Sequence, residues 1–224
     1  MNDITIIMLT PNRVPKLWAK YHRQVLTKAI GDTPIITISK EPLDWGINLH
    51  QTKYGYANIY KQMLRGAKLA TTKYIAMADD DTLYPRQHFE YRPPKDGFYY
   101  NFTRWALPSW GTNKRDIRYF YKPKPGNGCM IATRQLVIEA MEARLAADSK
   151  LTGYFTKELG SSKRMIPYDK VWAQSFYTSE PILSIVHDLS ADAAAQRHKK
   201  YIWHVRAYDI PNWGRAEEIL KKFI

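Results

Sequence analysis

Residues 74–81 read YIAMADDD, and this stretch decides the fold. Its first five residues are apolar without alternation, which predicts a short strand buried on both faces, as in parallel sheets covered by helices. The three aspartates would then stand at the carboxyl end of that strand. Ligands of open α/β sheets bind at this edge, so the same eight residues predict both an architecture and the position of a site.

Two similar units precede this stretch. The apolar runs 4–9 and 34–39 predict strands, and apolar residues recur with the helical period over 14–30 and 56–70. Gly31 is a natural end for the first of these helices. Three strands joined by two helices predict a Rossmann-type α/β fold: a mostly parallel sheet flanked by helices, with right-handed crossovers.

The rest of the chain changes character. Residues 85–126 are rich in proline and aromatic residues, which favours short strands and long loops. Beyond them the pattern predicts helices over 133–146, 168–177 and 212–223, a polar loop over 150–165 and a strand over 182–186. No repeat or linker divides the chain, so we expect a single domain over 1–224.

Charge and cysteine content narrow the class of protein. The 34 Lys and Arg outnumber the 21 Asp and Glu, which gives a net charge of +13 and favours a polyanionic partner: nucleic acid, an anionic membrane face or an anionic glycan. A basic surface serving solubility alone is the alternative. The single cysteine, Cys129, excludes an internal disulfide and a cysteine-based zinc site. No run reaches membrane length and no signal-peptide pattern opens the chain, so we expect a cytoplasmic protein without stable membrane insertion.

The triple aspartate is the strongest chemical signal. Adjacent carboxylates repel one another, and Mg²⁺ and Mn²⁺ favour carboxylate oxygens together with substrate phosphates. A solvated acidic turn or a helix cap is the alternative. Placed directly after a buried strand, Asp79, Asp80 and Asp81 predict a divalent metal site.

Residues 56–81 resemble the nucleotide-sugar-binding half of GT-A glycosyltransferases of the family-two type, in which a helix leads to a strand and then to an Asp-x-Asp motif. The resemblance implies Mn²⁺ or Mg²⁺ and a nucleotide-sugar donor, a UDP-sugar by frequency. It implies that Asp81 and Asp79 hold the metal, that Asp79 also helps to place the ribose or sugar, and that Asp80 assists. The same resemblance divides the chain into a nucleotide-sugar-binding half, 1–84, and an acceptor-binding half with a basic tail, 85–224.

Other segments extend the resemblance. The turn after the first strand matches the family's site for base and ribose, and basic residues near the diphosphate would add positive charge. The residues concerned are Thr10, Pro11, Asn12, Arg13, Lys199 and Lys200.

Three single residues are also implicated by position. Gly128 lies in a glycine-containing segment like the one beside the family's acceptor, although a simple turn is the alternative. Asp169 stands where the family's acidic motif supplies the catalytic base, although Tyr168 replaces a frequent acid and a helix cap is the alternative. His187 ends the strand 182–186 where the family often has a further metal ligand, with His198 and His204 as the alternatives.

The reaction that the resemblance implies is transfer of a sugar to a hydroxyl group, with inversion if Asp169 is the base; retention stays open. The acceptor is indicated by basic residues interleaved with aromatic residues over 104–124 and 197–206, since basic groups suit phosphates and aromatic rings suit exposed bases. The expected acceptor contacts are Arg104, Trp105, Trp110, Lys114, Arg115 and Arg118.

These features predict a DNA glycosyltransferase of the kind that bacteriophages use on 5-hydroxymethylpyrimidine bases. A transferase acting on cell-envelope or surface polysaccharide or lipid is the first alternative, because aromatic rings also bind sugars. A nucleotidyltransferase and a non-catalytic DNA-binding protein are further alternatives. The sequence gives no indication of the oligomeric state, the donor sugar or the choice of metal.

Overall fold

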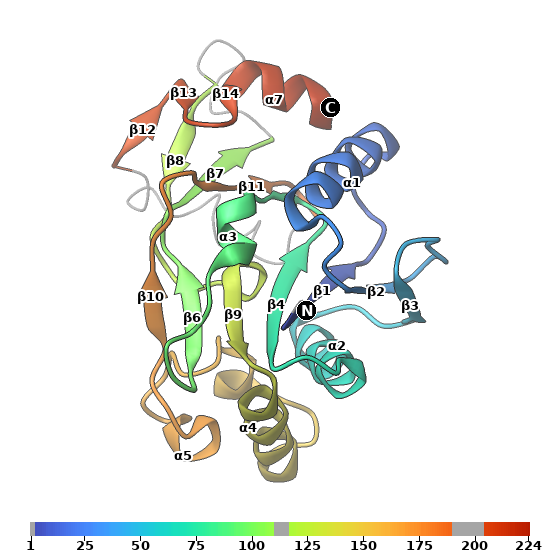
Figure 1. Cartoon of the computed structure of the whole chain (residues 1–224), viewed down its shortest axis with the longest axis vertical. Helices are drawn as coiled ribbons and strands as arrows, with labels where there is room; N and C mark the ends of the chain where they lie inside the picture. Colours follow the sequence, from blue (N-terminus) through green and yellow to red (C-terminus); the bar gives the residue numbers. More distant parts are fainter. Residues whose placement is uncertain (1–2, 110–116, 190–203) are drawn as a thin grey trace.

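A seven-stranded sheet forms the centre of the computed structural model, which describes residues 3–109, 117–189 and 204–224. The strand order is β10-β6-β9-β4-β1-β2-β3, and β9 alone runs antiparallel to its neighbours (Figure 1). The expected mostly parallel α/β sheet is confirmed, with β3 as a strand that the sequence pattern had not indicated. The bounds are β1 (Ile4–Thr10), β2 (Ile35–Ser39), β3 (Ile47–His50), β4 (Tyr74–Asp79), β6 (Phe98–Asn101), β9 (Met130–Thr133) and β10 (Gln174–Phe176).

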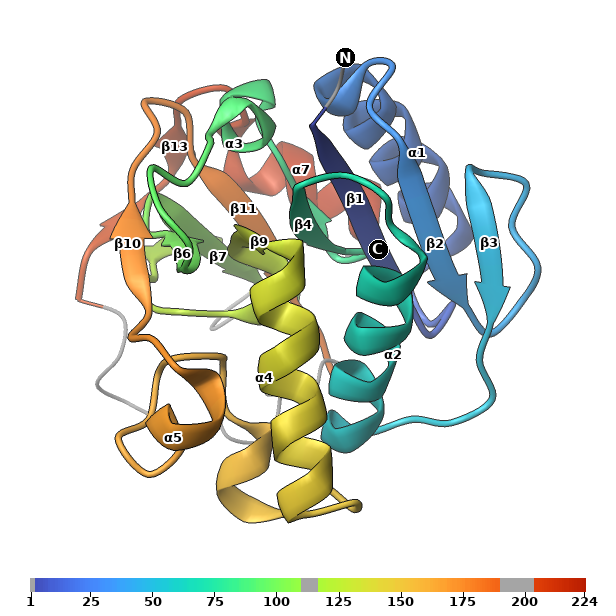
Figure 2. The same ribbon diagram turned by 60° about the horizontal axis from the view of Figure 1, so that its bottom comes forward.

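Helices cover both faces of this sheet, so its central strands are buried. All seven residues of β1 are buried, as their uninterrupted apolar character requires. The helices α2 (Tyr56–Leu69) and α4 (Arg134–Ala147) lie together on one face, and α1 (Lys16–Ile30) lies on the other (Figure 2). In α2, Gly66 permits close approach, because a Cβ there would come within 2.6 Å of Cγ2 of Ile7.

A second, five-stranded sheet begins directly after the triple aspartate. Its order is β12-β8-β7-β11-β5, and the short β5 pairs antiparallel with β11. A separate hydrophobic cluster lies beneath it, and α1 contributes Trp18 to this cluster. The aspartates therefore stand where the two sheets meet. The bounds are β5 (Thr82–Leu83), β7 (Arg104–Pro108), β8 (Tyr119–Tyr121), β11 (Ile182–Val186) and β12 (Arg206–Ala207).

Short elements complete the described chain. Two 3₁₀ turns, η1 and η2, lie on either side of α4, and a hairpin of β13 and β14 precedes the terminal helix. Within the described ranges, no helix is long and apolar enough to cross a lipid bilayer. The bounds are α3 (Arg86–Glu90), η1 (Asn127–Cys129), η2 (Gly153–Thr156), β13 (Asp209–Ile210), β14 (Gly214–Arg215) and α7 (Ala216–Phe223).

The prediction of a helix over 168–177 is wrong. A single turn, α5 (Ile166–Asp169), ends at Lys170, whose positive φ of 68° stops a right-handed helix. The chain then forms β10, which pairs with β6 at the sheet edge. Phe176 of β10 stacks on Tyr91 with ring centres 3.9 Å apart, so edge pairing and ring packing outweigh the helical pattern. The terminal helix is likewise shorter than expected, because residues 209–215 form the hairpin.

Trp18 of α1 contacts both the terminal helix and the triple aspartate, and these contacts lead to a prediction about stability. It is fully buried, its ring meets Phe223 of α7 edge-on at 5.1 Å, and its Nε1 donates to the carbonyl oxygen of Asp80 at 2.9 Å. Trp18→Phe keeps most of the packing and leaves that carbonyl without its donor. We expect a loss of about 1–3 kcal/mol in the free energy of unfolding, measured by urea titration.

Leu17→Ala is the control, because Leu17 is 74% exposed and should change stability by less than about 0.5 kcal/mol. Equal effects of the two substitutions would contradict the assigned role of Trp18.

Candidate functional site

Asp79, the last residue of β4, is fixed by a tyrosine and a glycine. The hydroxyl of Tyr84 accepts a hydrogen bond from the Asp79 amide at 2.9 Å and donates to the Gly128 carbonyl at 2.7 Å. Gly128 lies against the carboxylate itself, since a Cβ there would stand 2.1 Å from Oδ2 of Asp79. Only glycine leaves room for the Asp79 side chain in its present position.

Asp80 points back toward β1. The hydroxyl of Thr10 donates to Oδ2 of Asp80 and accepts a hydrogen bond from the Asn12 amide at 2.9 Å. Burial, followed by the charge of Asp81, raises the pKa of Asp80 to about 8. The middle carboxylate therefore fastens the turn to the first strand.

Asp81 faces the second sheet. Its carbonyl accepts from the Ile185 amide at 2.8 Å, and its Oδ1 accepts from the Thr82 hydroxyl at 3.0 Å. The pairing of β5 with β11 brings His187 to the same place, with Nε2 at 3.6 Å from Oδ2 of Asp81. Of the alternative histidines, His204 is exposed and His198 lies outside the described residues.

The carboxylates fit a divalent cation bound jointly with a substrate. Burial and then the charge of Asp81 raise the pKa of Asp79 to about 7, opposed by the Arg104 guanidinium. The buried His22 behind the turn stays neutral, since burial lowers its pKa to about 4. A cation would relieve this repulsion, and Mg²⁺ and Mn²⁺ commonly take one or two protein carboxylates plus phosphate oxygens. No ready group of three ligating side chains exists among the described residues, so the remaining ligands would come from substrate and water.

A pocket of about 450 Å³ opens on the β1 side of the aspartates. At its rim the guanidinium of Arg13 lies over the Tyr54 ring at 3.8 Å, and Lys40 bonds to the Tyr54 hydroxyl. The pocket is lined by seven of the expected site residues: Thr10, Pro11, Arg13, Asp79, Asp80, Asp81 and His187. Amide side chains from α2 and from Gln51, directly after β3, add polar groups, and Gln51 donates to the Thr10 carbonyl at 3.1 Å.

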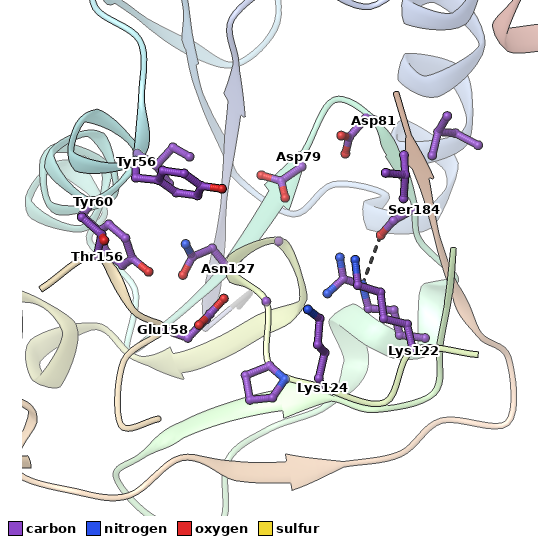
Figure 3. Close-up of a pocket in the computed structure, with 17 residues that line it drawn as sticks. Tyr56, Tyr60, Asp79, Asp81, Lys122, Lys124, Asn127, Thr156, Glu158 and Ser184 are labelled. Atoms are coloured by element: carbon purple, nitrogen blue, oxygen red, sulfur yellow. Dashed lines mark hydrogen bonds between the residues drawn. The ribbon is translucent and has the colours of Figure 1, made fainter. Parts of the chain in front are cut away.

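A smaller pocket of about 160 Å³ lies on the other side of Asp79 and Asp81 (Figure 3). Figure 3 shows Glu158 on one wall and Lys122 and Lys124 on the opposite wall, below the two aspartates. Arg104 belongs to the basic wall, where its Nε donates to Oγ of Ser184 at 3.2 Å. The pocket thus places a carboxylate opposite three cationic side chains.

Asp169 requires a correction. The residue expected as catalytic base is fully buried and forms a two-pronged ion pair with Arg144, with contacts of 2.6 and 2.7 Å. A carboxylate with no exposed surface and both oxygens held in this way has no access to an acceptor proton. Asp169 therefore belongs to the interior of the protein, and Glu158 is the carboxylate that lines the small pocket together with Asp79 and Asp81.

Asn12 is a second correction. It takes a left-handed φ of 56°, and its Oδ1 accepts from the amides of Lys40 and Glu41 at 2.9 and 3.0 Å. It fastens the loops after β1 and β2 and does not line the pocket.

The expected acceptor residues separate into three groups. Arg104 and Gly128 line the smaller pocket. Trp105 packs on the second hydrophobic cluster beside Tyr121, and Arg118 lies over the Tyr208 ring, so neither lines the described pockets. The remaining expected site residues lie outside the described ranges: Trp110, Lys114, Arg115, Lys199 and Lys200.

Several pocket residues had no distinctive signal in the sequence. Glu158 lies in a polar loop without periodicity, and Tyr54 follows a short edge strand. Lys122 and Lys124 were part of the basic run, but their spacing did not separate them from the other basic residues. Only the proximity created by folding identifies these four residues.

No protein-family model and no curated protein matches the chain. Among solved structures, a mannosyltransferase from Pyrobaculum calidifontis, in complex with GDP-Man and Mn²⁺, aligns with a TM-score of 0.50 at 13% identity. The alignment covers 87% of this chain and 59% of the mannosyltransferase. At this identity the likeness shows a shared fold alone.

Two further structures show the range of proteins that resemble this one. A glycosyltransferase involved in the glycosylation of the major capsid of PBCV-1 has a TM-score of 0.46 and 10% identity, covering 87% of this chain and 98% of that one. A nucleotidyl transferase from Methanothermobacter thermautotroptrophicus has a TM-score of 0.45 and 13% identity, covering 81% and 89%. The proteins of similar fold thus include glycosyltransferases and a nucleotidyl transferase.

The contact between Gly128 and Asp79 generates a prediction. Gly128→Ala forces the Asp79 carboxylate to move, because the added methyl group would occupy its place. We expect Mn²⁺ affinity, measured by calorimetry, to fall roughly 10–100-fold while the protein stays folded. Gly31→Ala is the control: its Cβ meets nothing within 4 Å, so the strain at its positive φ should lower stability and leave Mn²⁺ affinity unchanged. Unchanged Mn²⁺ affinity in Gly128→Ala would separate Asp79 from the metal site.

Proposed function

We propose that the protein is a metal-dependent glycosyltransferase that moves a sugar from a nucleotide-diphospho-sugar to a hydroxyl acceptor. One observation carries the proposal: Asp79 and Asp81 stand in the wall shared by a large pocket and a small one. The large pocket has room for a nucleotide, and the small one presents a carboxylate at Glu158. This arrangement suits a donor that crosses the aspartates, with its sugar in the small pocket.

The large pocket has groups suited to a nucleoside. The Arg13–Tyr54 stack offers a flat cationic and aromatic surface for a base. Gln51 and Asn58 are bonded to each other and to main-chain carbonyls, so they fix the shape of the wall beside this stack. Lys40 and Arg13 give this rim positive charge. We propose a UDP-sugar as the donor, because UDP-sugars are the most frequent donors of such enzymes.

Asp79 and Asp81 would hold Mn²⁺ or Mg²⁺, and Nε2 of His187 lies 3.6 Å from Oδ2 of Asp81. Such a cation, when bound, supplies Lewis-acid neutralisation of the charge on the leaving diphosphate. Arg104, which already opposes the charge of Asp79, adds a fixed positive group on the same side. Contacts of Lys199 and Lys200 with the diphosphate remain a prediction.

Glu158 replaces Asp169 in our proposal as general base. Its carboxylate accepts the proton of the acceptor hydroxyl while the acceptor oxygen bonds to the anomeric carbon. The bond from that carbon to the diphosphate oxygen breaks, and its electron pair leaves with the diphosphate. Attack from the face opposite the leaving group inverts the anomeric configuration.

We propose DNA carrying 5-hydroxymethylpyrimidine bases as the acceptor. The basic wall of the small pocket, together with the net charge of +13, favours an acceptor that carries phosphates. A base flipped from its stack would bring a primary hydroxyl to Glu158. A polysaccharide or lipid acceptor is the competing identity.

A nucleotidyltransferase reaction is less well supported by the site. Such enzymes often cradle triphosphates in a glycine-rich loop after the first strand, whereas residues 9–13 contain no glycine. Here the loop is instead fastened by Asn12 to the loop after β2.

Glu158→Gln tests the chemical step. Loss of the base should lower the transfer rate roughly 10²–10⁴-fold and leave donor affinity near that of the wild type, because the donor nucleotide occupies the other pocket. Transfer is measured by mass spectrometry of the product and donor binding by calorimetry. Glu142→Gln, in an exposed ion pair with Lys68, is the matched control and should keep full activity. A fully active Glu158→Gln enzyme would contradict the assignment.

The acceptor has its own test. The protein is incubated with Mn²⁺, a panel of nucleotide-sugars and duplex DNA with or without 5-hydroxymethylpyrimidine. The DNA is then digested to nucleosides, whose masses are measured by mass spectrometry. A sugar mass on the modified base, with DNA binding that weakens steeply as salt rises, is the expected result. Metal-dependent hydrolysis of the donor without modification of DNA would contradict DNA as the acceptor and would favour a glycan acceptor.

A further inference from the structure

The interior of the protein holds an ion pair that the proposed reaction does not use directly. Arg144 of α4 and Asp169 of α5 are both fully buried. Nε and Nη2 of Arg144 donate to Oδ1 and Oδ2 of Asp169 at 2.6 and 2.7 Å. A buried pair of this kind contributes little net stability over apolar packing, because both charges lose their hydration. Its presence therefore needs a reason other than stability.

The same two side chains hold the loop that carries Glu158. Nη1 of Arg144 donates to the carbonyls of Lys157 at 2.8 Å and Phe155 at 3.3 Å. Oδ2 of Asp169 accepts the amide of Gly160 at 2.7 Å. The hydroxyl of the buried Tyr100 donates to the carbonyl of residue 159 at 2.9 Å. Main-chain groups immediately before and after Glu158 are thus bonded to buried side chains, while its own side chain lines the pocket.

A second contact joins the pair to the pocket. The guanidinium carbon of Arg144 lies 5.7 Å from the centre of the Tyr60 ring, and Tyr60 lines the small pocket with Glu158. Burial, and to a lesser extent the charge of Glu158, raises the pKa of the Tyr60 hydroxyl, which stays a neutral polar group beside the carboxylate. Arg144 therefore contacts both Tyr60 and the main chain next to Glu158, which are two parts of the same pocket wall.

We propose that Arg144 and Asp169 are positioning residues that fix the 155–160 loop so that Glu158 faces the acceptor. The inference rests on the proposed function of Glu158. A general base must lie within hydrogen-bond reach of the proton that it removes, and a displacement of about 1 Å can cost about 10²-fold in rate. A buried bidentate pair suits this task, because its planar geometry defines orientation as well as distance.

A double-mutant cycle tests the inference. Arg144→Lys keeps the charge but loses the fork, and Asp169→Asn keeps the shape but loses the charge. We expect each to lower kcat by about 10²-fold, with little change in KM for the donor, in the otherwise wild-type enzyme. In the Glu158→Gln background the same substitutions should cause little further loss, because they act through the residue already removed. Equal losses in both backgrounds would overturn the positioning role.

A readout without turnover keeps the inference testable if a variant is unstable or the acceptor is unknown. Hydrogen exchange of the amides at 157–161 should accelerate in Asp169→Asn, while the amides of β1 and β4 keep wild-type protection. Unchanged exchange at 157–161 would overturn the inference, as would general loss of protection in both substitutions, which would make the pair purely structural.

Glu139→Gln is the matched control, because it removes the exposed ion pair with Lys170 that also joins α4 to the α5 region. It should leave kcat and exchange at wild-type values. A fully active Glu158→Gln enzyme would instead refute the proposed function, so the two failures are distinguishable.

Discussion

Three carboxylates at the end of a buried strand repel one another and lose hydration, and the surrounding structure is arranged around this constraint. Each aspartate is held by different partners. Tyr84 and Gly128 hold Asp79, Thr10 and Trp18 hold Asp80, and β11 holds Asp81 through the Ile185 amide. Because these partners come from both sheets and from α1, the position of the triple aspartate depends on the whole domain.

This arrangement gives the three aspartates different functions. Asp80 bonds to Thr10 and lines only the large pocket, whereas Asp79 and Asp81 line both pockets. A metal held there would face nucleotide groups on one side and the sugar on the other. The larger pocket has an aromatic and cationic stack and amide groups, which suits a nucleotide. The smaller pocket has a carboxylate facing cationic side chains, which suits an acceptor.

Local patterns predicted the parts of the fold that depend on local sequence. The strands at 4–9, 34–39 and 74–78 and the first helices follow from uninterrupted apolar runs and helical periodicity. The edge strands were not predictable in this way: β10 forms because Phe176 stacks on Tyr91 and its backbone pairs with β6. The site divides similarly. Asp79 and Asp81 were singled out by their place after a strand, and both line pockets. Asp169, expected as the base, is instead buried against Arg144, and the sequence did not indicate that Glu158 lines the small pocket.

The most direct test of the central claim is calorimetric titration of the protein with a panel of nucleotide-sugars, with and without Mn²⁺. The account predicts that one donor binds only when the metal is present. It also predicts that Asp81→Asn abolishes this binding while Glu158→Gln retains it. Donor binding that is equally tight without metal and unaffected in Asp81→Asn would contradict the assignment of the aspartates as the metal and donor site.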